Sequence, residues 1–183
     1  MKNRAPEHWG KIQVYTGDGK GKTTAALGTA LRAFAAGKRV MVIYFDKGGN
    51  HYSERAILQK LKMDFMATGL DRIDPDTGRF RFGVTPEDIA EGSRGFQVAT
   101  DAIMGESYDL VVLDEINTSI SLGIIPLDPV LKMLDHKPPQ VEVICTGRTA
   151  PQEVCDRAEL VTNMQIVKHY FYHGEAAREG LDF

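Results

Sequence analysis

The residues with the clearest capacity for chemistry form a glycine- and lysine-rich run, Gly17-Asp18-Gly19-Lys20-Gly21-Lys22-Thr23-Thr24. Its alternating glycines allow a tight turn in which successive backbone N–H groups converge on phosphate oxygens. Lys22 can bridge the distal phosphates of a nucleoside triphosphate, and the Thr23 hydroxyl can bind Mg²⁺. The run therefore predicts a phosphate-binding loop in which residues 17–24 contact a nucleotide.

One position departs from the usual phosphate-loop pattern, G-x-x-x-x-G-K-[ST], because this chain has Thr16 where the first glycine is expected. The Gly-Lys-Thr end of the pattern is intact. A glycine-rich turn can be purely structural, but this one lies between a predicted strand and an alanine-rich predicted helix, which is the context that phosphate binding requires. We therefore expect a loop with an altered start and a functional end.

A pair of carboxylates, Asp114-Glu115, follows the apolar run Leu110-Val111-Val112-Leu113. In proteins with a phosphate-binding loop, such a strand end lies beside the loop, and a carboxylate there holds Mg²⁺ directly or through water. Acidic residues also end strands for solubility alone. The pair therefore indicates a metal site only in combination with the phosphate-binding loop. Because neighbouring residues of a strand point to opposite sides, only one of the two is expected to face the metal.

Four short runs rich in valine and isoleucine are predicted to be the strands that position these residues. Each is separated from the next by a stretch long enough for a crossover helix, which is typical of a parallel sheet. The predicted fold class is α/β and P-loop NTPase-like, with a mainly parallel, doubly wound sheet flanked by helices. The four strands are Ile12–Tyr15, Val40–Phe45, Leu110–Leu113 and Val141–Cys145.

Three helices are predicted around this sheet. The first covers residues 23–36 and stops before Gly37, a residue typical of helix C-termini. The second covers residues 86–104, with Thr85 as its N-cap and proline at its first position. The third covers residues 126–134. They supply the crossovers that a parallel sheet needs.

At 183 residues, the chain has the size of one domain with one sizeable core. We expect a short extension over residues 1–10 and a single P-loop α/β domain over residues 11–183. A net charge of −3 argues against a nucleic-acid partner. No apolar run approaches the ~20 residues that span a bilayer, and the N-terminus lacks a signal peptide, so a soluble cytoplasmic protein is expected. Cys145 and Cys155 are interpreted as packing residues.

Taken together, these motifs resemble the ATP:corrinoid adenosyltransferases of the cob(I)yrinic acid a,c-diamide type, over nearly the whole chain from Ile12 to Phe183. Family members carry a near-identical glycine-lysine run with the same missing first glycine. The other segments that carry the resemblance are Phe45-Asp46-Lys47-Gly48, Ser53-Glu54-Arg55, Met66-Ala67-Thr68-Gly69, Val111-Val112-Leu113-Asp114-Glu115, Thr146-Gly147-Arg148, Val167-Lys168-His169 and Gly180-Leu181-Asp182-Phe183.

The resemblance implies a reaction in which the Co(I) of a corrinoid attacks the 5′ carbon of ATP and triphosphate leaves. Cobalt is then the nucleophile, and no Ser, Cys or His nucleophile with an attendant base is evident by motif. The implied cofactors are ATP and Mg²⁺, with a corrinoid, cobalamin or cobyrinic acid a,c-diamide, as substrate. The resemblance also implies that ATP binds reversed in the loop, which fits the altered start at Thr16.

Carried over residue by residue, the resemblance assigns residues 17–23 to the triphosphate and Thr23 with Glu115 to Mg²⁺. Lys22 and Glu115 are the implied catalytic residues. Arg32 is a further nucleotide contact or a solvated helix arginine. Arg148 follows a predicted strand, where ligands bind in open α/β sheets, and is either a nucleotide contact or a turn residue. The same alternatives hold for Lys47.

Two departures from the family concern the corrinoid. Relatives often carry Gly-Phe-Thr-Trp, whose aromatic side chains favour cobalt reduction, where this chain has Gly69-Leu70-Asp71-Arg72. Phe80 and Phe82, in the predicted long loop over residues 69–84, are candidates to replace them, although that loop can equally be a tolerated insertion. The second departure is a short N-terminus. Relatives with a longer helical extension use it to cover the corrinoid, and here the cover is either incomplete or supplied by another segment.

The expected partners are ATP and a corrinoid, a flavoprotein-type reductant and a second copy in a homodimer, with no nucleic acid and no membrane. Two other P-loop functions stay open. One is an ATPase or nucleotide-dependent switch acting on a protein, and the other is a small-molecule kinase. Their products differ: adenosyl transfer leaves triphosphate, hydrolysis leaves ADP and phosphate, and a kinase leaves ADP with a phosphorylated acceptor.

Overall fold

A single parallel sheet organises the part of the chain that the computed structural model describes, residues 9–73, 76–77, 79 and 81–182. The strand order is β3-β2-β4-β5-β1-β6, and every neighbouring pair is parallel. The sheet confirms the predicted α/β class. Its strands are β1 (Ile12–Thr16), β2 (Val40–Tyr44), β3 (Asp64–Ala67), β4 (Leu110–Asp114), β5 (Glu142–Thr146) and β6 (Leu160–Asn163).

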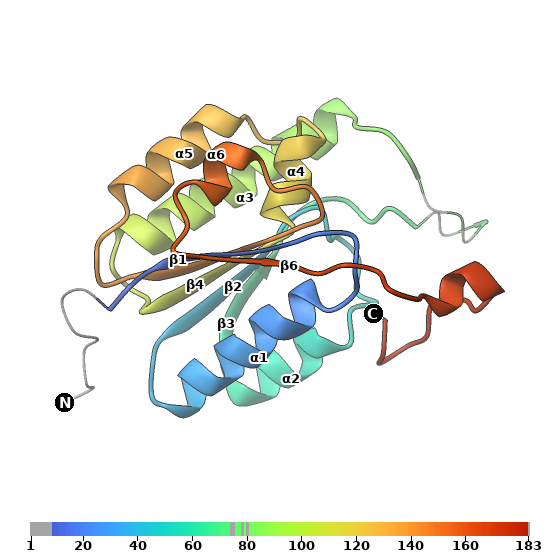
Figure 1. Ribbon diagram of the computed structural model, residues 1–183, viewed down its shortest axis with the longest axis horizontal. Coiled ribbons are helices and arrows are strands. Elements are labelled where there is room, and N and C mark those ends of the chain that lie inside the picture. Colours follow the sequence, from blue (N-terminus) through green and yellow to red (C-terminus); the bar gives the residue numbers. More distant parts are fainter. Residues whose placement is uncertain (1–8, 74–75, 78, 80, 183) are drawn as a thin grey trace.

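Helices cover both faces of the sheet (Figure 1). One face carries α1 (Lys22–Ala35) and α2 (Glu54–Leu61). The opposite face carries α3 (Pro86–Met104), α4 (Ile116–Ser121), α5 (Leu127–His136) and α6 (Gln152–Cys155), and a short 3₁₀ helix, η1 (Tyr170–His173), lies in the C-terminal segment. Coverage on both sides explains why β2, β4 and β5 are buried at every residue and read as continuous apolar runs.

The core therefore divides into two layers, one on each side of the sheet. Val42 and Tyr44 of β2 pack with the face that includes Ala26 and Ala30 of α1. Ile43, between them in the strand, packs on the other side with residues of α3, α4 and α5. Successive side chains of a strand point to opposite faces, so one apolar strand serves both layers.

The predicted elements match the central part of the fold. The four predicted strands correspond to β1, β2, β4 and β5, and the three predicted helices to α1, α3 and α5, with ends shifted by no more than a few residues. The sequence did not predict the edge strands β3 and β6 or the helices α2, α4 and α6. Both edge strands have only four residues, and β6 is exposed throughout, so neither has the continuous apolar run of a central strand.

The predicted N-cap of α3 is confirmed. The Thr85 hydroxyl accepts a hydrogen bond from the backbone N–H of Asp88 (3.3 Å), and the Thr85 N–H donates to the Asp88 carboxylate (2.8 Å). This reciprocal pair is a capping box, which fixes where a helix starts. The preceding loop is tied to the same helix end, because Arg81 donates to Asp88 at 2.7 Å.

Arg72, in the loop where relatives carry an aromatic pair, is 8% exposed. Its guanidinium pairs with Asp46 (2.8 Å) and donates to the backbone carbonyl of Gly83 (2.7 Å). An ionic cluster anchors this loop at the position of the family's aromatic side chains. Phe82 is 85% exposed, and Phe80 lies outside the described residues, so the hypothesis that the two replace the missing aromatics stays a prediction.

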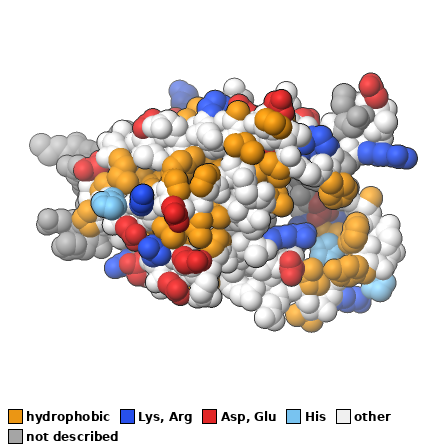
Figure 2. Space-filling model, turned by 90° about the horizontal axis from the view of Figure 1, so that it is seen from above, with side chains coloured by type: hydrophobic (Ala, Val, Ile, Leu, Met, Phe, Trp, Pro, Cys, Tyr) orange, Lys and Arg blue, Asp and Glu red, His pale blue; other side chains and the backbone are white. Residues whose placement is uncertain are grey.

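The surface over α3, α5 and α6 mixes acidic, basic and apolar side chains (Figure 2). No helix among the described residues combines the length and the apolar character needed to span a bilayer. Cys145 is buried in β5, and both cysteines are free thiols, in agreement with their interpretation as packing residues. The division into an extension over residues 1–10 and one domain stays a prediction, because residues 1–8 lie outside the described residues.

Candidate nucleotide-binding site

A cavity of about 960 Å³ opens beside the carboxyl ends of the parallel strands. Ligands of open α/β sheets bind at this edge. The cavity lies between the phosphate loop, the loop after β2 and the C-terminal segment. Its lining residues include Asp18, Gly19, Lys20, Gly21, Lys22, Thr23 and Thr24, together with Lys47, Glu115 and Arg148. Most residues of the predicted nucleotide site therefore lie in one place.

The phosphate loop turns from β1 into α1 through backbone conformations that glycine permits. Gly17 has a φ of 96° and Gly21 a φ of 114°, in the left-handed region that other residues rarely adopt. Gly19 is required for space, because a Cβ atom there would lie 2.7 Å from the carbonyl oxygen of Met164. The backbone conformation therefore favours glycine at positions 17 and 21, and the lack of space requires it at position 19.

The missing first glycine is explained by the position of Thr16. This residue ends β1 in regular pairing with Asn163 of β6, so its backbone needs no glycine. Its hydroxyl donates to the Arg148 carbonyl (2.7 Å) and accepts from the Ala150 N–H (3.0 Å). The threonine thus ties the start of the loop to the segment that follows β5, a contact that glycine could not make.

Lys22 lies over the loop that precedes it. Its ammonium donates to the backbone carbonyls of Gly17 (2.7 Å) and Gly19 (2.8 Å), and the residue is only 8% exposed. Burial lowers the pKa of this ammonium. The N-cap of α1 is Gly21, which offers no side-chain cap, and the first turn of the helix holds no acidic residue. The helix end therefore presents its positive pole to the cavity, and no acidic residue of its own first turn neutralises it.

Beneath the loop, Asp114 forms a buried hydrogen-bonding centre. Its Oδ1 accepts from the hydroxyls of Thr23 (2.9 Å) and Thr146 (2.7 Å), and the residue is 1% exposed. The sheet explains this meeting, because β5 lies between β1 and β4, and Thr146 ends β5 beside the end of β4. Asp114 does not line the cavity; it orients the Thr23 hydroxyl from below.

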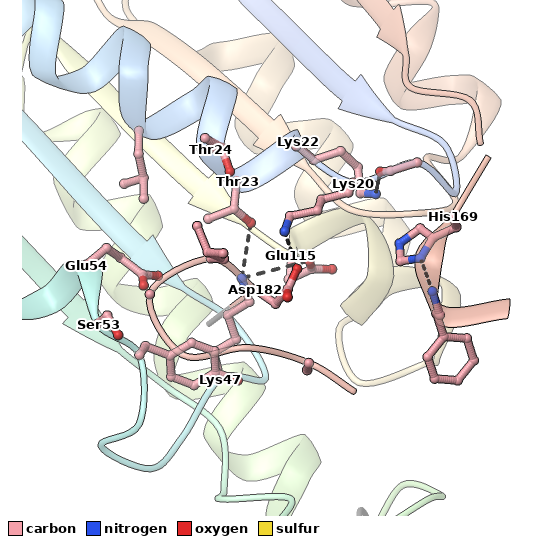
Figure 3. Close-up of a pocket in the computed structure, with 18 of the residues that line it drawn as sticks. Lys20, Lys22, Thr23, Thr24, Lys47, Ser53, Glu54, Glu115, His169 and Asp182 are labelled. Atoms are coloured by element: carbon pink, nitrogen blue, oxygen red, sulfur yellow. Dashed lines mark hydrogen bonds and ion pairs between the residues drawn. The ribbon is translucent and has the colours of Figure 1, made fainter. Parts of the chain in front are cut away.

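Lys47 extends from the loop after β2 to the same centre. Its ammonium donates to Asp114 Oδ2 (2.6 Å) and to the Thr23 hydroxyl (3.1 Å), and it lies 3.9 Å from Glu115 Oε1. Figure 3 shows this ammonium pointing toward Thr23 and Glu115. Burial alone would lower the pKa of Lys47, but the carboxylates of Asp114 and Glu115 outweigh it and raise that pKa.

Glu115 is the carboxylate that faces the cavity. Its backbone adopts a left-handed conformation, with a φ of 64°, at the N-cap of α4. The backbone N–H donates to the Thr146 hydroxyl (2.9 Å), and the side chain, 22% exposed, accepts from the Thr118 hydroxyl. The two neighbouring carboxylates thus point to different places, one under the loop and one into the cavity.

The C-terminal segment closes the cavity from the other side. Lys20 donates to the Tyr170 hydroxyl (3.0 Å) and forms an ion pair with Asp182, visible in Figure 3. Arg178 reaches the same carboxylate at 3.3 Å. Hydrogen bonds from Lys20 and Tyr170 lower the pKa of Asp182. A segment more than a hundred residues away in sequence therefore contacts the phosphate loop directly.

Two predicted residues do not line the cavity. Gly17 contributes through its carbonyl, which accepts from Lys22, whereas Arg32 is exposed on α1. Sequence reasoning assigned no role in the nucleotide site to the cavity residues Tyr52, Ser53 and Glu54 or to those of the C-terminal segment, which include His169, Tyr170 and Asp182. Their motifs are visible in the sequence, but nothing local in those motifs indicates that they face a phosphate loop.

The comparison with protein families agrees with this geometry. Residues 8–183 match the ATP:corrinoid adenosyltransferase BtuR/CobO/CobP family. This chain belongs to that family. As a corrinoid adenosyltransferase, it transfers the adenosyl group of ATP to a corrinoid.

Similar proteins from several bacteria carry the same description. The adenosyltransferase is 37% identical over 182 residues to the corrinoid adenosyltransferase of Escherichia coli K12, covering 98% of this chain and 89% of that protein. It shares the same identity and coverage with the corrinoid adenosyltransferase CobA of Salmonella typhimurium. It is also 34% identical to an uncharacterized protein of Nostoc, where the match covers 94% of this chain but spans about half, 48%, of that longer protein.

Proposed function

We propose that the enzyme binds MgATP with its triphosphate in the loop of residues 17–23 and directs C5′ of the ribose toward the Co(I) of a bound corrinoid. The observation that carries this proposal is the uncapped start of α1. Its first N–H groups, its positive pole and the Lys22 ammonium lie at the cavity, and no side chain caps the helix start and no acidic residue lies in its first turn. These groups stabilise the charge that builds on triphosphate as the carbon–oxygen bond breaks.

Lys22 is the proposed catalytic cation. Its ammonium is held by two neutral carbonyls, which are weaker partners than phosphate oxygens. An incoming triphosphate can take over these hydrogen bonds without a rearrangement of the loop. Thr24, Asp18 and Lys20 line the same cavity and complete the proposed triphosphate site, with Arg148 as a further contact.

The residues fit a magnesium ion. Mg²⁺ takes oxygen ligands and is usually held by one or two carboxylates together with substrate phosphates. Thr23 and Glu115 present a hydroxyl and a carboxylate to the cavity, and the ammonium of Lys47 beside them shows that this set of oxygens accommodates positive charge. We assign both residues as metal ligands. The ion would supply further charge stabilisation for the leaving triphosphate.

Three finer features of the proposal rest on the family resemblance. The corrinoid is cobalamin or cobyrinic acid a,c-diamide, an external reductant of the flavoprotein type maintains Co(I), and the enzyme forms a homodimer. Equilibrium sedimentation tests the dimer: a mass twice the 20.3 kDa of the chain supports it, and a mass equal to that of one chain contradicts it.

The activity test is anaerobic incubation with MgATP and chemically reduced cob(I)alamin, repeated with cobyrinic acid a,c-diamide. We expect the spectrum of a cobalt–carbon bond and an equimolar amount of triphosphate. Lys22→Met should lower the rate about 10²–10³-fold, the usual loss for one stabilising group at the developing charge. Lys132→Met, at an exposed lysine of α5 outside the cavity, is the control and should leave the rate unchanged. ADP in place of triphosphate would contradict the proposed reaction.

A further inference from the structure

The ammonium of Lys47 lies among the oxygen atoms proposed for the metal. It is 3.1 Å from the Thr23 hydroxyl, 2.6 Å from the Asp114 carboxylate and 3.9 Å from the Glu115 carboxylate. Thr23 and Glu115 are the assigned ligands, and Asp114 orients Thr23. A lysine side chain thus brings one positive charge to the position where a magnesium ion would bring two.

The surrounding structure holds the backbone of Lys47 in place. Its N–H donates to the carbonyl of Thr68 (3.0 Å), and the guanidinium of Arg55 donates to the carbonyls of Lys47 and Gly49. Asp46, just before it, has a positive φ of 51°. A non-glycine residue in that conformation persists only where its surroundings impose it. The loop is therefore built to direct this lysine inward.

The side chain has its own supports. The ammonium lies 5.9 Å from the ring centre of Tyr44 and 5.7 Å from that of Tyr52, within the range of attraction between a cation and an aromatic ring. Lys47 is 15% exposed and lines the cavity. Its tip consequently has two environments within reach, the buried carboxylate of Asp114 below and the cavity above.

The ammonium and a metal ion cannot use these oxygens together, because two cations at such distances repel each other strongly in a partly buried site. Without either cation, the carboxylate of Asp114, 1% exposed, would be a buried charge without compensation, which is costly. A metal ion that enters must therefore displace the ammonium. The proposed triphosphate in the cavity offers it new anionic partners.

We propose that Lys47 is an internal counter-ion that occupies the metal position of the nucleotide-free enzyme and moves onto triphosphate oxygens when the metal enters with ATP. The inference rests on the metal and triphosphate sites of the proposed function. Lys47 is then a substrate-binding residue, and the binding of metal and the binding of nucleotide depend on each other. Metal alone binds weakly, because nothing then receives the ammonium, and metal with nucleotide binds tightly.

The test measures Mn²⁺ binding without nucleotide or corrinoid, by electron paramagnetic resonance of the free ion. Replacing Lys47 by methionine, Lys47→Met, should tighten Mn²⁺ binding about tenfold or more, because the ion then compensates Asp114 without competition. The matched control is Lys60→Met, which removes the same charge from an exposed position of α2. It should bind Mn²⁺ as the wild type does.

A second measurement separates this role from a general change in charge. With ATP present, Lys47→Met should bind the Mn²⁺–ATP complex more weakly than the wild type, so the two affinities move in opposite directions. Circular dichroism verifies folding, and Lys47→Gln, which keeps hydrogen bonding without charge, replaces the methionine variant if that variant unfolds.

Equal Mn²⁺ affinity in the folded variant and the wild type would overturn the inference, as would tighter binding in the Lys60→Met control. Because the first measurement contains no nucleotide and no corrinoid, it is independent of the transfer assay. Failure of adenosyl transfer would therefore leave the result for Lys47 intact, and failure of the Lys47 test would leave the proposed transfer intact.

Discussion

Two carboxylates reach basic residues of the same cavity from opposite sides, and their surroundings differ. Asp114 belongs to a central strand, is 1% exposed and holds Lys47 together with two hydroxyls. Asp182 belongs to the C-terminal segment and holds Lys20, whose side chain is 41% exposed. Both contacts join a lysine to a carboxylate, and they differ in burial, because the side chain of Asp182 is 13% exposed.

Burial decides what each contact can do. Removing one partner of a buried ion pair leaves a charge that water cannot reach, whereas an exposed pair is screened and contributes little to stability. The floor of the proposed phosphate site, at Asp114, is therefore buried in the protein. The contact of Lys20 with the C-terminal segment is the more exposed of the two, so we expect it to contribute less to stability.

The largest expected effect is at the buried side. Asp114→Asn leaves the Lys47 ammonium without its carboxylate in a buried position, and we expect the free energy of unfolding to fall by about 3 kcal/mol. Urea denaturation followed by circular dichroism measures it. Asp64→Asn, at an exposed carboxylate of β3, is the control and should change stability little. If the free energy of unfolding fell no more for Asp114→Asn than for the control, the proposed difference between the buried and the exposed carboxylate would be contradicted.

The ion pair of Asp88 with Arg81 is intermediate in burial. Asp88 is 1% exposed, but its partner Arg81 is 33% exposed, and the pair joins the capping box of α3. Asp88→Asn should lower the free energy of unfolding by about 2 kcal/mol, since it weakens both the cap and the ion pair. The expected loss lies between those of Asp114 and Asp182, and any other order would contradict the role given to burial.

The same residue predicts a pH dependence. The Arg81 guanidinium lowers the pKa of Asp88 to about 2. In the unfolded chain the pKa of this carboxyl is about 4. The stabilisation that the ionised Asp88 gives to the folded state is therefore complete above about pH 4 and is lost as the pH falls toward 2. Wild type should lose more stability than Asp88→Asn over this interval in urea titrations at successive pH values. Parallel acid profiles would contradict the assignment.

The smallest effect on stability is expected at Asp182. Asp182→Asn should change the urea midpoint little, because its partner Lys20 is 41% exposed and solvent screens the ion pair. ATP binding should tighten slightly at low salt, since Lys20 is released and a competing anion is lost. Isothermal titration at low and high salt measures this change. A large loss of stability would show that the C-terminal segment belongs to the core.

Prediction from the sequence succeeded where the determinants are local. The phosphate loop, the N-cap at Thr85 and the central strands depend on residues within a few positions of one another. It failed for β3 and β6, because short edge strands form through pairing with a neighbour and not through an apolar run of their own. Arg32 is exposed on α1 and does not line the cavity, so both interpretations of it, nucleotide contact and solvated helix arginine, stay predictions.

Local patterns were thus sufficient for the family, the parallel sheet and the phosphate loop, because glycine spacing and apolar runs act through the backbone nearby. The arrangement around the loop required folding of the whole chain. Lys47 meets Thr23 across 24 positions and Asp114 across 67, and Lys20 meets Asp182 across 162. Such contacts depend on which strands become neighbours in the sheet, and only the packing of the whole chain decides that order.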